Sequence, residues 1–276
     1  MTTPDDSFEA TALPFIDDVR RFALSLTRDE SDADDLVQDT FLKAFRSWAS
    51  YTPGTNCRGW LFTICRNTFN RQFRRERARP DIEREAGDED ALPTVIGHIR
   101  AERLGLGDLL DRVDVRPTLK KAMDDLPDVF REIVTLVDLE EFSYAEAAEV
   151  LEVPVGTVRS RLFRARRRMQ SSLLQHAVDM GLAPAGTDVE ARLDPAPAFP
   201  PDCEVVVRAL WDLVDNELPE VDMQQMRAHM DDCQYCRAHE DFERQLAREI
   251  ADLRTDPGDS RSLVDRVRAR IVSARN

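Results

Sequence analysis

The pattern of hydrophobic and polar residues predicts helices along almost the whole chain. Apolar residues recur at helical spacing over residues 15–26 and again over residues 37–48. Ser31-Asp32, between these two stretches, is the expected N-cap of the second helix. A turn over residues 52–56 precedes a third helix from residue 60 to about residue 79, and no alternating pattern of useful strand length occurs. We therefore expect an all-α protein.

Two stretches rich in proline, glycine or acidic residues divide the chain. Residues 81–115 are acidic and poorly periodic, which predicts a flexible linker. Residues 181–201 are rich in proline, which predicts an extended linker. The helical domains expected around these linkers cover residues 8–80, 116–180 and 202–276. Within the last domain the pattern predicts four helices, over residues 204–217, 221–232, 234–254 and 260–274.

A short helix, a tight turn and an arginine-rich helix follow one another in the second domain. The first helix covers residues 144–151, and Pro154 prevents its continuation because proline lacks an amide hydrogen. The next helix opens near Gly156 and carries six arginines and no acidic residue between positions 159 and 168. Its apolar stripe consists of Val158, Leu162, Ala165 and Met169. This is the design of a helix-turn-helix that reads the major groove of DNA, although an ordinary helical hairpin with a basic, solvated face is the alternative.

Composition and charge narrow the class of protein. The 276 residues are 42% hydrophobic, which is enough to bury real cores. No apolar run approaches the roughly 20 residues that span a bilayer, and the acidic N-terminus does not resemble a signal peptide. We therefore expect a cytoplasmic protein that does not bind membranes. The formal net charge is −15, yet residues 61–79 and 155–187 each contain six arginines and one acidic residue, a distribution that suits local contacts with phosphates.

Four potential metal ligands lie late in the chain, spaced as Cys-x25-His-x3-Cys-x2-Cys. His229 and Cys233 are four residues apart and share one helix face, Cys236 follows a turn later, and Cys203 comes from the preceding segment. Three thiolates and one imidazole suit a tetrahedral, structural zinc ion. His239 is a competing ligand. The alternatives are unrelated thiols or a redox dithiol, although the βαβ context of such a dithiol is absent.

The segment around the arginine-rich helix, SYAEAAEVLEVPVGTVRSRLFRARRRM, resembles region 4 of bacterial sigma factors of the extracytoplasmic-function (ECF) type. The segments DADDLVQDTFLKAFRSW and GWLFTICRNTFNRQFRRERAR resemble region 2 of the same family. The resemblance covers about residues 12–176, with both regions in the family's order. It implies a transcription initiation factor, not an enzyme, that binds core RNA polymerase and promoter DNA. A helix-turn-helix regulator that binds operator DNA without polymerase is the alternative.

The resemblance also implies roles for individual residues. The contacts with the polymerase clamp would be made by Asp35, Leu36, Gln38, Asp39 and Phe41. The contacts with the melted −10 element would be made by Thr55, Asn56, Arg58, Arg66, Asn67, Asn70, Arg71, Arg74 and Arg75. The residues that align with the −35 contacts are Arg159, Ser160, Phe163, Arg164 and Arg167. For Trp48, Trp60 and Phe62 we expect core packing, and for Cys57 and Cys65 buried or incidental thiols.

Residues 202–274 resemble the zinc-binding anti-sigma domains, which are usually separate proteins. The spacing of the cysteines and histidine, the preceding helix VVVRALWDLVDNELP and the terminal amphipathic helix SLVDRVRARI carry this resemblance. It implies a small domain that wedges between regions 2 and 4 and covers polymerase-binding surfaces. A tether gives an effective concentration up to about millimolar, and the acidic tail could complement the basic stretches. We therefore expect a sigma factor inhibited in cis through contacts between its C-terminal domain and its sigma domains, with thiolate ligands that are open to oxidation.

Overall fold

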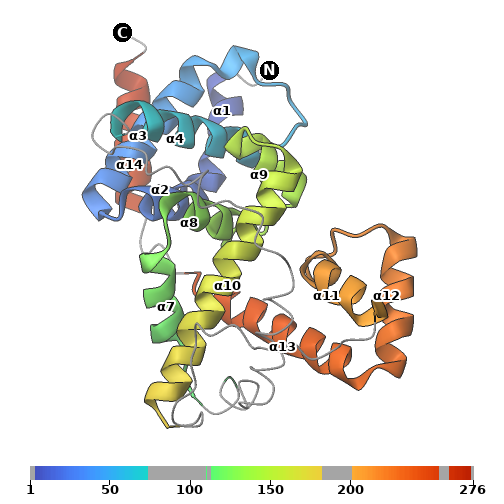
Figure 1. The fold of residues 1–276 in the computed structure, drawn as a ribbon. Coiled ribbons are helices and arrows are strands. Elements are labelled where there is room, and N and C mark those ends of the chain that lie inside the picture. Colours follow the sequence, from blue (N-terminus) through green and yellow to red (C-terminus); the bar gives the residue numbers. More distant parts are fainter. Residues whose placement is uncertain (1–3, 74–109, 111–112, 182–200, 255–260, 275–276) are drawn as a thin grey trace. The chain divides into compact units, whose positions relative to one another are not determined.

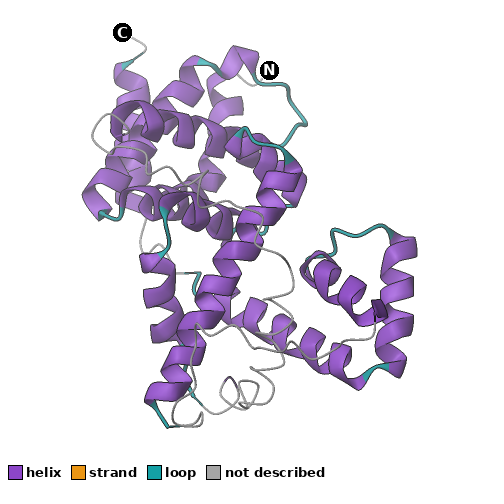
Figure 2. Cartoon of the chain, viewed as in Figure 1, coloured by secondary structure: helices purple, strands orange, loops and turns teal. Residues whose placement is uncertain are grey.

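The computed structural model describes residues 4–73, 110, 113–181, 201–254 and 261–274. These residues are helical throughout, apart from turns and loops, and carry no strand (Figures 1 and 2). The prediction of an all-α protein is therefore confirmed for the described chain. Most of the two predicted linkers lies outside the described residues. None of the helices described is both long and apolar enough to cross a bilayer.

The chain forms two compact units that do not follow the order of the sequence. The first unit consists of residues 1–80, 128–161 and 254–276, and the second of residues 81–127 and 162–253. One helix, α10 (Val155–Asp179), begins in the first unit and continues into the second.

The N-terminal part of the first unit is a set of helices around an aromatic core. It contains α1 (Pro4–Ala12), η1 (Leu13–Phe15), α2 (Ile16–Thr27), α3 (Glu30–Arg46), η2 (Trp48–Ser50) and α4 (Cys57–Phe73). Phe22 and Phe62 are fully buried and stack with ring centroids 4.8 Å apart. Trp48 packs edge-on against Phe8 at 5.1 Å and lies 5.9 Å from Trp60. The expected core packing is confirmed for Phe62, whereas Trp48 and Trp60 are half-buried at the edge of this aromatic cluster.

Helix α3 starts earlier than the sequence pattern predicts. Arg28 adopts a left-handed backbone, with φ 64°, and ends α2. Asp29 is the N-cap, because its Oδ1 accepts a hydrogen bond at 3.0 Å from the amide of Asp32. The prediction of Ser31-Asp32 as the cap was wrong, because the carboxylate of Asp29 accepts the hydrogen bond from the free amide of Asp32.

The first unit also contains α8 (Asp128–Val134), η3 (Thr135–Leu139), α9 (Tyr144–Leu151) and the start of α10. Ser143 and Glu146 form a capping box that begins α9. Glu152, with φ 53°, ends this helix in a left-handed conformation, and the carbonyl of Pro154 accepts the amides that open α10. The helix–turn–helix predicted for these residues is confirmed.

Helix α14 (Arg261–Ser273) completes the first unit and packs against α3, although more than two hundred residues separate them in the chain (Figure 1). Its buried side chains are Leu263, Val267 and Ile271, each 2% exposed or less. Their spacing of four residues places them on one stripe, which makes α14 the amphipathic helix that the sequence predicts.

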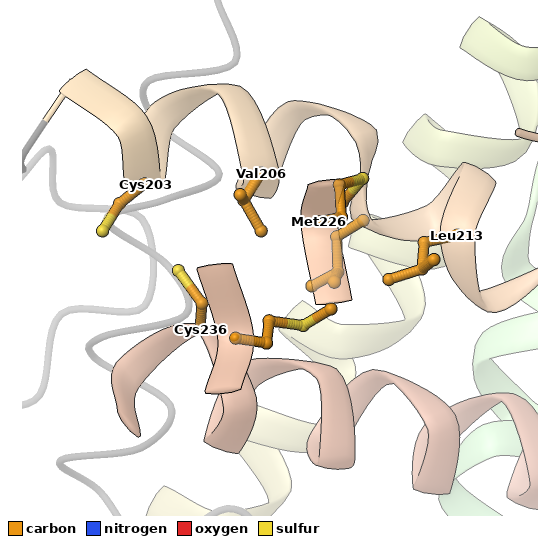
Figure 3. Close-up of a cluster of buried hydrophobic side chains, with 7 residues drawn as sticks. Cys203, Val206, Leu213, Met226 and Cys236 are labelled. Carbon is orange, nitrogen blue, oxygen red and sulfur yellow. The ribbon is translucent and has the colours of Figure 1, made fainter. Parts of the chain in front are cut away.

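The second unit holds most of the C-terminal segment. It contains α7 (Arg116–Asp125), the later part of α10, α11 (Pro201–Val214), α12 (Glu220–Asp232) and α13 (Gln234–Ala251). Together with α14, helices α11–α13 match the four predicted C-terminal helices to within a few residues. The core between α11, α12 and α13 includes Val206, Leu213 and Met226, with Cys203 and Cys236 at one end (Figure 3).

Candidate functional site

The arginine-rich helix α10 buries one stripe and exposes another. The predicted apolar stripe of Val158, Leu162, Ala165 and Met169 is confirmed, because each residue is 1% exposed or less. Arg159 is exposed, and its guanidinium lies 5.8 Å from the ring of Tyr144. The Ser160 hydroxyl donates to the carbonyl of Thr157 at 3.2 Å, so it is engaged by the backbone of its own helix.

The later part of α10 contains one arginine that the sequence analysis did not set apart. Arg166 is 1% exposed and pairs with Asp215 through two hydrogen bonds, of 2.7 and 3.0 Å. Its guanidinium also lies 4.1 Å from the ring of Trp211. Arg166 follows Leu162 by four residues, and this spacing is the sequence signal that could have placed it on the buried side. Of the side chains predicted to contact the −35 element, Phe163, Arg164 and Arg167 are partly exposed here, and Arg167 lies 5.9 Å from the Phe163 ring.

The residues predicted to contact the −10 element lie in the turn before α4 and along this helix. Thr55, Asn56 and Arg71 are exposed, whereas Arg74 and Arg75 lie outside the described residues. Asn56 starts the helix, because its Oδ1 accepts the amide of Gly59 at 2.8 Å. The remaining members, Arg58, Arg66, Asn67 and Asn70, lie within the described part of α4.

Two arginines of this set are engaged by carboxylates in the same unit. Arg66 is 8% exposed, and its Nε donates to Glu132 at 3.0 Å. Arg58 donates to the carboxylate of Asp18 at 2.7 Å, to the carboxylate of Glu140 and to the Glu140 carbonyl at 2.6 Å. The Arg58 guanidinium also lies between two rings, 5.2 Å from Phe62 and 4.6 Å from Phe142.

Glu140 lies at the buried centre of a charge cluster that also contains Asp18, Arg21 and Arg58, and its side chain is 0% exposed. It accepts hydrogen bonds from Arg21 and Arg58, and Arg254 lies 3.4 Å from its Oε2. Burial opposes the charge on Arg21, yet hydrogen bonds to Glu140 and Asp18 raise the pKa of its guanidinium. No periodicity in the sequence singled out Glu140, because it follows the end of a helix.

The predicted polymerase-binding residues of α3 divide into exposed and buried members. Asp35 is exposed, and Gln38 and Asp39 are partly exposed. Leu36 and Phe41 are 1% and 0% exposed, so they are not surface residues in this structure. The sequence pattern could have indicated this, since both fall on the apolar side of the helix.

Helix α14 contacts the acidic side of α3 through arginines. Arg266 pairs with Asp34 at 2.5 Å, and Arg270 pairs with Asp39 at 2.5 Å. Arg20 also donates to Asp34, at 2.8 Å. Burial alone would raise the pKa of Asp34, but the hydrogen bonds from Arg20 and Arg266 lower it below its ordinary value. The α14 helix has four arginines and one aspartate, which complements the acidic α3.

The four predicted metal ligands converge in the second unit. Their ligand atoms all lie within 4.8 Å of one another. Cys203 Sγ is 3.5 Å from His229 Nε2 and 3.8 Å from Cys233 Sγ. Tetrahedral zinc with Zn–S bonds of about 2.3 Å separates its sulfur ligands by about 3.8 Å, so this donor set fits zinc. Cys203 is on the first turn of α11, His229 on the last turn of α12, and Cys236 on the first turn of α13.

The chemistry of the cluster requires a cation if its thiols are to ionise. Burial and the nearby sulfurs of Cys203 and Cys233 raise the pKa of the Cys236 thiol far above its ordinary value. A divalent ion at the centre would reverse this effect, because it stabilises thiolates directly. His239 does not belong to the cluster; its Nε2 lies 3.3 Å from Glu243 Oε1. The first choice of His229 over His239 agrees with this geometry.

The remaining cysteines are buried in the first unit. Burial raises the pKa of Cys57, and it raises the pKa of Cys65 to about 12. Thiols with such pKa values are poor nucleophiles at neutral pH. Their expected role as buried, unreactive thiols agrees with this environment.

The fold and these sites define a class of transcription factor, with a helix-turn-helix, a second basic helix and a cysteine–histidine cluster. Comparison with known families finds sigma-70 region 2 over residues 14–79, sigma-70 region 4 over residues 118–169 and a putative zinc finger over residues 203–237. The chain belongs to the ECF family of RNA polymerase sigma factors, which are transcription initiation factors and not enzymes. We refer below to residues 14–79 as region 2 and to residues 118–169 as region 4.

The sequence of one sigma factor in particular supports this membership. The chain is 34% identical to the ECF RNA polymerase sigma factor EcfG of Rhodopseudomonas palustris, over 64% of this chain and 91% of that protein. It is 38% identical to the ECF RNA polymerase sigma factor SigE of Mycolicibacterium smegmatis, over 58% of this chain and 59% of that protein. A solved structure of the sigma factor RpoE with the anti-sigma factor NepR from Bartonella quintana is 31% identical, covers 61% of this chain and 97% of that chain, and has a TM-score of 0.43.

Proposed function

We propose that this sigma factor is held inactive in cis by its own C-terminal segment, residues 202–276. The observation that carries the proposal is the packing of α14 on α3, the helix that bears the expected polymerase contacts. Arg270 pairs with one of these residues, Asp39, and Arg266 pairs with the neighbouring Asp34. A polymerase subunit that needs Asp39 would therefore have to displace α14.

Apolar burial supports this contact more than its ion pairs do. Fully burying each of Leu263, Val267 and Ile271 stabilises the docked helix by about 1.5–3 kcal/mol. The arginines of the ion pairs are 41–50% exposed, and such surface pairs are worth about 0–1 kcal/mol each. The ion pairs therefore align α14 on α3, and the apolar stripe supplies most of its affinity.

The other part of the C-terminal segment contacts region 4. Asp215 pairs with the buried Arg166 of α10, and Gln170 of the same helix donates to Glu243 of α13 at 2.8 Å. These contacts agree with the expectation that the acidic tail complements the basic stretch of region 4. In region 2 the charges are reversed, because a basic helix of the tail meets the acidic α3.

We further propose that Cys203, His229, Cys233 and Cys236 hold one structural zinc ion. The ion would join α11, α12 and α13 at one end of their shared core. Small cores of this kind commonly need a metal for stability. Four protein ligands leave no open position, so the zinc would stabilise the fold and would not supply catalysis.

The promoter contacts remain proposals at the level of residues. Arg159 is exposed at the start of α10 and, together with Ser160, would contact base edges of a −35 element. The turn before α4 and the face of α4 would meet the −10 element through the residues named above. RNA polymerase, as the partner, would supply the chemistry.

Removing residues 188–276 tests the inhibition. We expect the shortened chain to bind core polymerase more tightly than the full chain and to raise run-off transcription from a cognate promoter. The reason is that α3 loses its cover, while region 2 keeps its own aromatic core. Equal or lower polymerase binding by the shortened chain would contradict the proposal.

We propose oxidation of the cluster as the signal that relieves inhibition. Two neighbouring thiolates, such as those of Cys203 and Cys233, would give two electrons to hydrogen peroxide, form a disulfide and release zinc, while the peroxide is reduced to water. A zinc-sensitive dye and run-off transcription would follow the two events together. If peroxide leaves both zinc content and transcription unaltered, this part of the proposal fails.

A further inference from the structure

The surface of region 2 that is proposed to bind the −10 element is covered by glutamates from region 4, independently of the C-terminal segment. Four side chains of this surface each contact a different glutamate. The pairs are Asn56 with Glu146 at 2.8 Å, Arg58 with Glu140, Arg66 with Glu132 at 3.0 Å, and Asn67 with Glu152 at 3.1 Å. The four glutamates come from α8, the end of η3, α9 and the turn that follows α9.

The covered arginines cannot bind nucleic acid in this arrangement. Arg58 is held by three acceptors from Asp18 and Glu140, and Arg66 is 8% exposed against Glu132. A DNA phosphate would need the same guanidinium N–H groups that these carboxylates occupy. Each arginine can therefore bind the carboxylate or the phosphate, but not both.

The two asparagines lie at the exposed rim of the same contact. The Nδ2 of Asn56 donates to Glu146, and the Nδ2 of Asn67 donates to Glu152. Side-chain amides are groups that hydrogen-bond the edges of unstacked bases, and here carboxylate oxygens accept those hydrogen bonds. The glutamates thus accept hydrogen bonds both from the arginines and from the asparagine amides that are proposed to contact the promoter.

We propose that residues 132–152 of region 4 act as an internal mimic of promoter DNA, which closes this surface of region 2 until region 4 moves away. The mimic supplies negative charge and hydrogen-bond acceptors where the DNA would supply phosphates and base edges. The proposal rests on the promoter contacts assigned to region 2 in the proposed function, and it adds a second inhibitory contact on a different face from α3.

Glu140 connects this contact to the C-terminal segment. Arg254, which precedes α14 in the chain, lies 3.4 Å from Glu140 and 3.6 Å from Asp18. Arg254 is 39% exposed, whereas Arg21 and Arg58 surround the same carboxylate from region 2 at 11% and 21% exposure. Removing the C-terminal segment would therefore take away the most exposed of three arginines, and it would leave the glutamates of region 4 on α4.

Binding of single-stranded DNA by the full-length, zinc-loaded chain tests the mimic. The probe is a fluorescein-labelled 15-nucleotide single strand of random sequence, followed by anisotropy at several salt concentrations. We expect Glu140→Gln to bind it at least about tenfold more tightly than the unaltered chain, because Arg21 and Arg58 both lose the charge of Glu140 and keep only Asp18 as a carboxylate partner. Each arginine that is freed should steepen the dependence of log affinity on log salt by about 0.7. Glu141→Gln is the matched control, since Glu141 is adjacent and exposed, and it should change affinity less than twofold.

A second pair of variants covers the case in which Glu140→Gln does not fold. Glu146→Gln/Glu152→Gln alters only the rim of the contact, and glutamine keeps the capping box at Ser143. We expect a gain of about threefold or more, compared with Glu141→Gln/Glu149→Gln, which removes the same charge from exposed positions. An equal gain in this control would mean that general electrostatics raises the affinity, and the proposal would be wrong.

Replacing the asparagines separates this proposal from the assignment on which it rests. Adding Asn56→Ala/Asn67→Ala to Glu146→Gln/Glu152→Gln should cancel the gain if the glutamates cover these residues. A gain that survives would overturn the mimic. A different result would leave the promoter contacts intact. If no glutamate variant gains affinity, yet Asn56→Ala/Asn67→Ala alone weakens DNA binding, the asparagines already contact DNA in the presence of the glutamates. In that case only the mimic fails. If neither set changes binding, the assignment of the promoter contacts fails as well.

Discussion

The two parts of the C-terminal segment are stabilised by different means. Helices α11–α13 share a small core that ends in the cluster of Cys203, His229, Cys233 and Cys236. Helix α14 has no core of its own, and its apolar stripe is buried against α3 of region 2. Under the proposed function the first part would depend on a bound zinc ion, whereas the second packs on the surface that it covers.

Under the proposed function this difference would assign sensing to α11–α13 and blocking of polymerase to α14. A signal that removes zinc acts on α11–α13 and on their contacts with α10, whereas α14 keeps its own contacts with α3. Release of α14 must then follow from lost support along the chain, or from competition by polymerase for the same helix. The predictions below test each part separately, starting with the largest expected effect.

Loss of one zinc ligand should have the largest effect. Structural zinc binding in small domains has apparent free energies of about 10–16 kcal/mol at neutral pH, so Cys203→Ser or Cys236→Ser should unfold α11–α13. Elemental analysis should give one zinc per chain before the substitution and none after it, with a loss of helical circular dichroism. Cys65→Ala is the matched control, because Cys65 is equally buried but lies in region 2. A folded, metal-free segment would contradict the zinc site.

Separating α11 from region 4 should have the next largest effect. Arg166→Ala leaves Asp215 without its buried partner, and breaking such a pair costs about 3–5 kcal/mol. We expect a lower midpoint of urea unfolding for the full-length, zinc-loaded protein, with zinc content unchanged. Arg168→Ala, at an exposed position of the same helix, should change the midpoint little. Equal effects of the two substitutions would show that the Arg166 pair does not hold α11 against α10.

Undocking α14 should have a smaller thermodynamic effect but a direct functional one. Val267→Asp places a carboxylate in the buried stripe and removes at least the roughly 1.5–3 kcal/mol that the burial of this valine contributes. Because α3 is then uncovered, core polymerase should bind the full-length variant more tightly in a pull-down or by anisotropy, while zinc stays bound. Val272→Asp introduces the same charge further along the helix, at a residue that is 53% exposed, and it should leave polymerase binding unchanged.

The sequence predicted correctly those helices and motifs that depend on residues close to one another in the chain. The apolar stripe of α10, the four C-terminal helices and the four metal ligands each follow from spacing within a few tens of residues, and the structure agrees with all of them. The N-cap of α3 was not predicted correctly. Both Asp29 and Ser31 carry a side-chain oxygen, and the structure shows that Asp29 accepts the free amide.

Contacts between distant residues could not be predicted from the sequence. Arg166 looked like one more member of a basic face, because its partner Asp215 lies 49 residues away. The same holds for Glu140, whose contact with Arg58 spans 82 residues and has no periodicity to indicate it. Leu36 and Phe41 show the converse, since a resemblance assigned them to a docking surface whereas the structure buries both. Burial patterns should therefore qualify any role that is transferred from a family to single residues.

The smallest expected effect is the pH dependence of α14 docking. Hydrogen bonds from Arg20 and Arg266 lower the pKa of Asp34 below its ordinary value of 3.8, so this carboxylate favours the docked state while it is ionised. Its contribution is fully present above about pH 4 and is lost as the pH falls through the lowered pKa, by about 0.2–1 kcal/mol because Arg266 is half exposed. Hydrogen exchange of the α14 amides, corrected for intrinsic rates, should accelerate as the pH falls below about 4. Asp34→Asn should show faster exchange already at pH 6 and a weaker acid step. An acid step of the same size in Asp34→Asn would place the titration elsewhere and would leave the apolar stripe as the sole determinant of docking.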